Sequence, residues 1–223
     1  MLRVVALLVA TIGAYAEAPL QVLLVTGGHD HAPSFYSVFA AQKDIVTNVN
    51  PHPVAYNGRL DRYDVIVLYD MVQDLPEPQK ARLKAFAESG KGLVVLHHAV
   101  VSFESWPWYR ETIGAQYLEK KSTYKHDVEL KIEPVTPHPI TRGLGKFSIN
   151  EETYKGMWMS DKNTVLLRTS DPTSDGPVAW ISPYRESRVV TIQLGHSSLA
   201  HDSPEWRTLV RNAILWAGGR LKE

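Results

Sequence analysis

The sequence predicts a three-layer α/β fold built on a mostly parallel sheet with antiparallel strands at its edge. Three observations predict it. Strand-like and helix-like segments alternate along the chain, as in sheets whose strands are joined by covering helices. Several strand-like segments are apolar throughout, which is typical of parallel strands buried on both faces. The 223 residues are 44% hydrophobic and 22% charged, which is enough for one full core and predicts one domain.

The first 16 residues have the pattern of a secretory signal peptide. A short positive segment ending at Arg3 precedes the apolar run Val4–Gly13, and Ala14–Ala16 forms an A-x-A cleavage site. The run is shorter than the roughly 20 apolar residues that span a bilayer. A buried first strand or a retained anchor is the alternative. We expect cleavage before Glu17, export to the periplasm or the cell exterior, and a mature domain of residues 17–223 without a membrane span.

In the first third of the mature chain, strand signals dominate. Val22–Val25 is a continuous apolar run that ends in the turn Thr26–His29, as expected for a buried first strand. Val65–Tyr69 is a second such run. Between them, Phe35–Ala41 is weakly helical and Ile45–Val49 predicts a short edge strand.

The central segment contains the best-marked strand. A helix is predicted over Glu77–Glu88, because Pro76 precedes it and Gly90 follows it. It leads into the strand Leu93–Leu96. A second, short helix is predicted to begin near Trp106 and to end at Gly114.

The last third predicts further strands and one long helix. Apolar residues alternate with polar ones over Tyr117–Ile132, which favours antiparallel or edge strands. Ser203 is a natural N-cap, Pro204 follows at the first helical position, and Gly218 ends the apolar periodicity. The remaining predicted strands are Phe147–Ile149, Val165–Leu167, Val178–Ile181 and Val189–Leu194.

Composition and missing motifs exclude several classes of function. The chain has no cysteine, so it has neither a thiol nucleophile nor disulfides. Lys and Arg together equal Asp and Glu, 24 each, and this balance argues against nucleic acid as a partner. Gly27 and Gly28 lack the later glycines of a dinucleotide fingerprint, so we expect no nucleotide cofactor. No G-x-S-x-G motif supplies a serine nucleophile.

Five histidines follow predicted strands. His29 and His31 come after the first strand, His97 and His98 after the central one, and His196 after the last. The carboxyl ends of parallel strands share one edge of a sheet, where ligands bind, so these side chains are expected to converge. Imidazoles can hold zinc or another divalent metal, transfer protons, or donate hydrogen bonds to sugar hydroxyls.

The same residues also have plain structural interpretations. His97 can be a core histidine bonded to the backbone and His98 its solvated neighbour, and periodicity leaves open which of the two faces the crevice. Glu151 and Glu152 follow the short strand that ends at Ile149, where they can be a solvated loop pair or can supply a carboxylate beside the histidines.

Other histidines and aromatic residues have simpler expectations. Trp106, Trp108 and Tyr109 are either core residues or a stacking platform for a sugar ring. The prolines after His52 and His138 indicate turns. The pair His126 and Asp127 is expected to be exposed on a strand. His201 and Asp202 lie just before the last helix, where Asp202 can help to cap it.

Seven segments, in order, carry a family resemblance. The chain resembles the ThuA-like, or trehalose-utilisation, family, whose domain is similar to a class I glutamine amidotransferase without the cysteine nucleophile. The resemblance implies a flavodoxin-like three-layer sheet and spans nearly the whole mature chain. The matching segments are Val25–His29, Lys91–Ala99, Trp106–Gly114, His138–Leu144, Ile149–Tyr154, Pro177–Trp180 and Arg188–His196.

The resemblance also implies which residues belong to the site and which substrates it takes. His29, His97, Glu152, Tyr154 and His196 fall on family motif positions. The next residue, His98, occupies a place where the family often has a small residue. The acidic pair, usually Asp-Glu, is Glu-Glu here. The family is linked to the use of trehalose and other disaccharides, which implies a small sugar as partner.

These observations lead to two hypotheses of different class. The first is an exported enzyme, a hydrolase, lyase or isomerase, that acts on a sugar or keto-sugar. In it His29, His97 and His196 hold a divalent metal such as zinc, while His98, Glu152 and Tyr154 are catalytic. The second is a non-catalytic carbohydrate-binding module that binds sugar on Trp106, Trp108 and Tyr109. Both are compatible with a homo-oligomer.

Overall fold

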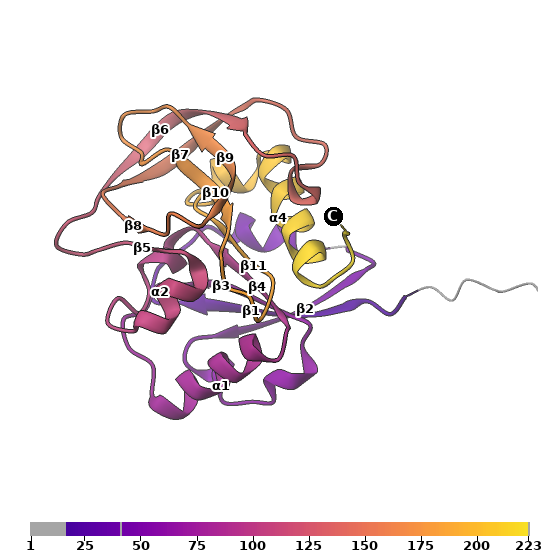
Figure 1. Ribbon diagram of the computed structural model, residues 1–223. Helices are drawn as coiled ribbons and strands as arrows, with labels where there is room; N and C mark the ends of the chain where they lie inside the picture. Colours follow the sequence, from indigo (N-terminus) through magenta and orange to yellow (C-terminus); the bar gives the residue numbers. More distant parts are fainter. Residues whose placement is uncertain (1–16, 41, 223) are drawn as a thin grey trace, which may run out of the picture.

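Nine strands form one sheet through the molecule (Figure 1). The computed structural model describes residues 17–40 and 42–222, so the expected signal segment, residues 1–16, lies outside the described residues. The strands, in spatial order, are β2 (Ile45–Pro51), β1 (Leu20–Gly27), β3 (Val65–Asp70), β4 (Gly92–Leu96), β11 (Val189–Ile192), β10 (Pro177–Ile181), β9 (Thr164–Thr169), β6 (Thr123–Pro134) and β7 (Phe147–Lys155).

The first five strands in this order are parallel, and the last four run antiparallel to their neighbours. Every residue of β3 and β4 is buried, because helices cover both faces of the parallel part. The predicted sheet, mostly parallel with antiparallel strands on one side, is confirmed.

The antiparallel strands follow the alternating pattern, with two differences from prediction. Val128, Leu130 and Ile132 of β6 are buried while their neighbours are exposed. β6 starts at Thr123, later than predicted. β7 runs on to Lys155, so the two glutamates that were expected to follow a short strand lie inside a long one.

Helices cover the two faces of the parallel strands, each over its own hydrophobic core. α4 (Pro204–Ala217) packs on one face, and α1 (Glu77–Glu88) and α2 (Pro107–Ile113) contribute to the core on the other (Figure 1). Where a weak helix was predicted, the chain forms the 3-10 helix η1 (Pro33–Val38). The short elements are η2 (Val54–Tyr56), η3 (Leu60–Arg62), η4 (His97–Val101), η5 (Pro139–Thr141), α3 (Ser198–His201) and the small sheet of β5 (Ala115–Gln116) and β8 (Trp158–Met159).

The last helix begins as its sequence predicts. The Oγ atom of Ser203 accepts a hydrogen bond from the backbone N–H of Trp206 over 3.2 Å, and Pro204 needs no partner at the first helical position. The helix then buries one apolar face against the sheet. Within the described part of the chain, no helix combines the length and the apolar character required to cross a membrane.

A close backbone approach fixes the loop after β1. Gly28 has a φ of +77°, and a Cβ placed there would lie 2.0 Å from the carbonyl oxygen of Met71, which follows β3. Only glycine allows the two segments to touch. The residue after Gly28, His29, is thereby held at the carboxyl edge of the parallel strands.

Candidate functional site

A cavity of about 240 Å³ opens at the carboxyl ends of the parallel strands. β1, β4 and β11 bring His29, His97, His98 and His196 to it from distant parts of the sequence. The complete lining is His29, Met71, His97, His98, Val101, Tyr117, Tyr124, His126, Glu152, Tyr154 and His196.

His97 is fixed in place by both its backbone and its ring. It follows β4 directly and has a φ of +44°, a left-handed conformation that costs a non-glycine residue of the order of 1–3 kcal/mol. Its Nδ1 donates to the carbonyl oxygen of Gln193 over 2.7 Å. The other nitrogen, Nε2, lies 3.6 Å from Oε1 of Glu152 and 3.2 Å from the hydroxyl of Tyr154.

Glu152 and Tyr154 reach this cavity from the edge of the sheet. They are two residues apart on β7, so their side chains lie on one face. Oε2 of Glu152 lies 3.5 Å from Nε2 of His196. Burial acts to raise the pKa of the Glu152 carboxyl, but hydrogen bonds and charge from His97, Tyr154 and His196 outweigh it and lower the pKa to about 2. Glu152 is therefore an anion at neutral pH.

The sheet bends back on itself to allow this contact. β7 is the last strand in the spatial order and is separated from β11 by β10, β9 and β6. Even so, the side-chain Nε2 of Gln193, just after β11, donates to the carbonyl oxygen of Glu152 over 3.0 Å. The edge strand thus closes over the ends of the parallel strands.

His98 is buried beside His97 and remains neutral. Its Nε2 donates to the carbonyl oxygen of Tyr69 over 2.9 Å, and its Nδ1 is buried without a hydrogen-bond partner among the described residues. Burial lowers the pKa of His98 to about 2. His98 therefore does not take up a proton near neutral pH.

Of the two histidines after β1, one lines the cavity. His29 is exposed, and its ring centroid lies 4.8 Å from that of His98 and 6.1 Å from that of His196. His31 turns away from the cavity and places Nε2 3.0 Å from the hydroxyl of Tyr36.

His126 reaches the cavity although the sequence predicted a plain exposed position. In the pairing of β6 with β7, Lys125 lies opposite Thr153 and Val128 opposite Glu151, so His126 and Asp127 together face Glu152. This β-bulge, with Asp127 at a φ of +55°, redirects the strand. Nδ1 of His126 lies 2.7 Å from Oε2 of Glu152, although half of the His126 side chain (51%) is exposed. The sequence contains one sign of this bulge. Asp127 lies inside the alternating strand, and aspartate tolerates positive φ better than most residues.

Apolar and aromatic side chains also line the cavity. Met71, Val101, Tyr117 and Tyr124 line it, and Tyr124, 60% exposed, lies at the solvent side. Sequence reasoning did not assign these residues to the site, because neither an apolar residue after a strand nor a tyrosine in an alternating segment shows which cavity it borders. Tyr117 lies beside Tyr154 and Tyr124 beside His126, with ring centroids 5.3 and 5.1 Å apart, so a ligand would meet aromatic rings next to the polar groups.

The three rings proposed as a sugar platform lie elsewhere. Tyr109 is 1% exposed and donates its hydroxyl to the carbonyl oxygen of Ala99 over 2.8 Å. Trp106 and Trp108 are partly buried and pack against the core on the α1 and α2 face. None of the three lines the histidine cavity.

Glu151 and His201 are buried behind the cavity. Glu151, 1% exposed, accepts only backbone hydrogen bonds among the described residues. Burial raises its pKa to about 7, against the effect of His97 and of these backbone N–H groups. His201 lies under the aromatic rings of Phe35 and Trp206, and burial lowers its pKa to about 4.

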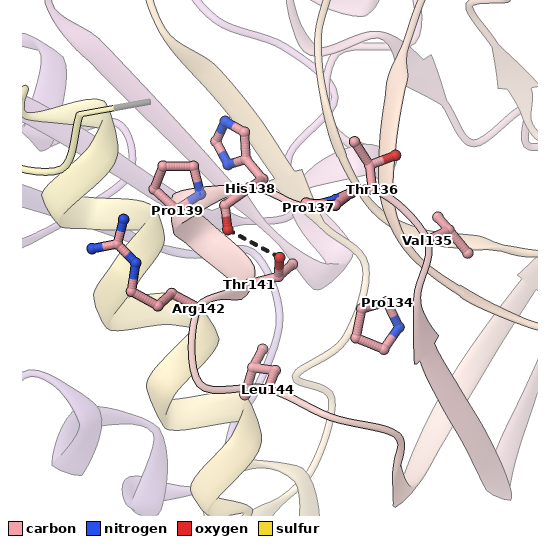
Figure 2. Close-up of a pocket in the computed structure, with 9 residues that line it drawn as sticks. All are labelled: Pro134, Val135, Thr136, Pro137, His138, Pro139, Thr141, Arg142 and Leu144. Carbon is pink, nitrogen blue, oxygen red and sulfur yellow. Dashed lines mark hydrogen bonds between the residues drawn. The ribbon is translucent and has the colours of Figure 1, made fainter.

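A wider hollow lies on another part of the surface (Figure 2). It measures about 600 Å³ and is formed by the loop around η5. Pro134, Pro137 and Pro139 line it, and Figure 2 shows the hydroxyl of Thr141 donating to the carbonyl oxygen of His138, a hydrogen bond of 3.0 Å. His138 marks a turn here, as predicted. We place the candidate site in the smaller cavity, because the histidines and the buried carboxylate are gathered there.

The ligand atoms in the smaller cavity are spaced for a metal ion. His97, Glu152 and His196 each offer one ligand atom, and these atoms lie within 4.8 Å of one another. Nε2 of His97 lies 3.6 Å from Oε1 of Glu152, and Nε2 of His196 lies 3.5 Å from Oε2. Neighbouring ligands around a tetrahedral zinc with bonds of about 2.0–2.1 Å are roughly 3.3–3.4 Å apart, so a small shift of the carboxylate would give one oxygen this spacing to both histidines. This cluster can hold a metal ion. It contains two of the three predicted ligands, with Glu152 where His29 was expected.

The fold and this cavity define a flavodoxin-like protein with a histidine-rich site at the strand ends. The sequence model of the ThuA family, described as trehalose utilisation, matches residues 21–217. The chain therefore belongs to the ThuA family, as the resemblance predicted. It matches none of the curated proteins with which it was compared.

Solved structures agree on the fold. A ThuA-like protein from Parabacteroides merdae has a TM-score of 0.80 at 18% identity, with 92% of each chain covered. One from Bacteroides uniformis has a TM-score of 0.74 at 19% identity, covering 93% of this chain and 95% of the other. A β-galactosidase from Rahnella sp. R3 has a TM-score of 0.62 at 14% identity, and the match covers 90% of this chain but 31% of that one.

Proposed function

We propose that this protein is an exported, metal-assisted enzyme that acts on a sugar or keto-sugar. One observation carries the proposal: two imidazoles and a carboxylate meet at ligand spacing inside a cavity at the carboxyl ends of the strands. The ThuA family supports a sugar as the substrate class, since it is described by trehalose utilisation. The signal pattern of residues 1–16 supports export.

The residues around the cluster fit zinc or a similar divalent ion. His97 donates from Nδ1 to a backbone carbonyl, which leaves the lone pair of Nε2 toward Glu152, the arrangement usual for metal-binding histidines. Glu152 in turn lies 2.7 Å from Nδ1 of His126, so the carboxylate has an outer partner as well. His97, His196 and Glu152 would hold the ion.

The proposed reaction uses three groups of the cavity: the bound ion, the carboxylate of Glu152 and the hydroxyl of Tyr154. A bound divalent ion supplies a Lewis acid that polarises a carbonyl or hydroxyl of the sugar. Glu152 has two oxygens, so that one can hold the ion while the other exchanges a proton with the substrate. Tyr154, with its hydroxyl 3.2 Å from Nε2 of His97, is placed to donate a hydrogen bond or a proton. The supported reaction class is proton abstraction beside a polarised carbonyl, followed by isomerisation or loss of a glycosidic substituent.

The remaining cavity residues would bind the sugar. Nδ1 of His98 is buried out of reach of a ligand, so hydrogen bonds to sugar hydroxyls would come from the exposed side chains of the cavity. His29, exposed at the cavity, would donate one. Tyr117 and Tyr124 offer ring faces or edges to the apolar C–H face of a pyranose.

Metal content and turnover test the proposal together. Protein purified without added metal is analysed for bound ions, and conversion of trehalose and of its keto derivative is followed with zinc and with a chelator. We expect metal bound at one equivalent and activity lost in the chelator and in His196→Ala. The control is His31→Ala, which changes a nearby histidine outside the cavity. Metal-free protein whose His97→Ala variant keeps full activity on every sugar contradicts the proposal.

The alternative, a non-catalytic carbohydrate-binding module, draws less support from the structure. It relied on Trp106, Trp108 and Tyr109 as a platform, and these rings pack with the core instead of lining the cavity. Saturable sugar binding that a chelator leaves unchanged, with no turnover, would favour the module over the enzyme.

A further inference from the structure

Side chains from other elements hold four backbone groups of the turn that carries His196. Residues 194–196 follow β11, and Gly195 has a φ of +122°. A Cβ at Gly195 would lie 2.9–3.1 Å from three ring atoms of Trp206. The indole Nε1 of Trp206 also donates to the carbonyl oxygen of Leu194 over 3.1 Å. The indole thus holds one side of this turn.

Two further side chains hold the carbonyl of Gly195. The hydroxyl of Tyr69 donates to this oxygen over 2.7 Å and Nε2 of His201 over 3.0 Å. Tyr69 is fully buried, and its ring stacks on Phe35 with centroids 3.7 Å apart. The carbonyl side of the turn is therefore saturated by donors from β3 and α3.

The N–H side of the turn is held by Glu151. Its Oε1 accepts from the backbone N–H of Gly195 over 2.5 Å, and its Oε2 accepts from that of His196 over 3.2 Å. Among the described residues it forms no ion pair with a lysine or arginine, although only 1% of its surface is exposed. Burying a carboxylate costs several kcal/mol unless hydrogen bonds compensate, so packing alone does not explain a glutamate here.

One strand links this turn to the carboxylate of the site. Glu151 and Glu152 are neighbours on β7, and adjacent side chains of a strand point to opposite faces. Glu152 therefore enters the cavity, 3.5 Å from Nε2 of His196, while Glu151 holds the main chain of the same histidine. A shift of β7 would move both contacts together.

We propose that Glu151 is a positioning residue: its carboxylate fixes the main chain of His196 and so sets the separation between His196 and Glu152. The expected effect of Glu151 on metal affinity rests on the proposed function. Its effect on the position of the His196 main chain does not require a bound ion. Partners behind the ligands of a metal typically change its affinity by about 10–100-fold when they are removed.

The variant Glu151→Gln keeps the shape and removes one of the two acceptors, because its amide NH₂ would face a backbone N–H. Zinc affinity is measured by competition with a chromophoric chelator on folded protein, with Glu129→Gln on the exposed side of β6 as the matched control. We expect roughly 10–100-fold weaker zinc binding for Glu151→Gln and unchanged binding for the control. Wild-type affinity in folded Glu151→Gln overturns the proposal.

Two further measurements keep the test decisive. If Glu151→Gln does not fold, Glu151→Asp keeps the carboxylate but shortens the side chain by one methylene, so that it no longer reaches both N–H groups, and zinc affinity equal to wild type in this variant overturns the proposal. Hydrogen exchange at the amides of Gly195 and His196 is read without metal, and we expect it to be faster in Glu151→Gln than in Glu129→Gln. If the wild type binds no zinc, the proposed function fails while exchange still decides the role of Glu151.

Discussion

The ring of His97 is tied to Gln193, the residue that follows the neighbouring strand β11, by a hydrogen bond of 2.7 Å from Nδ1 to the backbone carbonyl oxygen. A carbonyl only accepts, so Nδ1 carries the proton and Nε2 presents a lone pair. The backbone of His97 is at the same time left-handed. The imidazole is therefore held in one orientation at a strained turn.

The strain at His97 predicts an order of stability among its variants. His97→Gly and His97→Ala both remove the imidazole, but only glycine adopts a φ of +44° without steric cost. We expect His97→Gly to unfold at higher urea than His97→Ala, by about 1 kcal/mol in the free energy of unfolding. Equal stability, or a more stable alanine variant, would show that the turn is not strained.

His201 predicts a loss of stability in acid. Burial lowers its pKa to about 4, below the value of about 6.5 in an unfolded chain. Between these values the unfolded chain binds a proton that the folded protein does not, so stability falls as the pH falls from about 6.5 to about 4. One proton corresponds to a slope of at most about 1.4 kcal/mol per pH unit.

Urea unfolding at a series of pH values checks this slope. His201→Gln should be less sensitive to acid than wild type, because glutamine does not titrate and its amide can still donate to the carbonyl of Gly195. The comparison variant is His31→Gln, which replaces a histidine nearer the surface. An unchanged slope in His201→Gln would mean that other groups cause the acid sensitivity.

His126 predicts an effect on metal binding without an effect on folding. His126→Ala removes the donor 2.7 Å from Oε2 of Glu152 and should weaken zinc binding by about tenfold, the lower end for an outer partner, because the side chain is half exposed. The free energy of unfolding should change by less than about 0.5 kcal/mol. Zinc competition and urea unfolding measure the two quantities. Lys125→Ala, one residue earlier, is the control, and equal zinc affinity in both variants would remove His126 from the site.

The close approach at Gly28 predicts a large cost for a single methyl group. Gly28→Ala would place Cβ 2.0 Å from a backbone oxygen at positive φ, so we expect a loss of about 2 kcal/mol or more in the free energy of unfolding. Gly58→Ala is a matched control, since nothing lies within 4 Å of its added Cβ, and it should be neutral or stabilising by up to about 1 kcal/mol. Equal effects in thermal unfolding would contradict the packing of the loop after β1.

The parallel half of the sheet could be predicted because its signals are local. Val65–Asp70 and Gly92–Leu96 are continuous apolar runs, and runs of this kind have few stable places other than a sheet covered on both faces. The parallel order also explains why histidines after different strands meet at one edge. Pro204 and the Ser203 cap likewise mark the start of α4 in the sequence itself.

The carboxylate side of the site depends on long-range contacts that no local pattern contains. Glu151 and Glu152 read as a loop pair, because two adjacent glutamates are rarely buried in a strand. Their burial depends on backbone N–H groups near Gly195 and on His97, which are 44 and 55 residues away respectively. The β-bulge that brings His126 to the site also could not be predicted, because a pattern of alternating apolar and polar residues assumes a regular strand.

Because the sheet bends, the cavity is built from two separate parts of the fold, and each part can change in sequence without the other. The rigid parallel strands present His97 and His196, whereas the ribbon of β6 and β7 brings the carboxylate, His126 and the outermost aromatic ring, Tyr124. Substitutions of exposed residues on β6, such as Tyr124, can thus reshape the entrance for a new substrate without disturbing His97 and His196. We expect the sequences of relatives that act on different substrates to differ most in this ribbon.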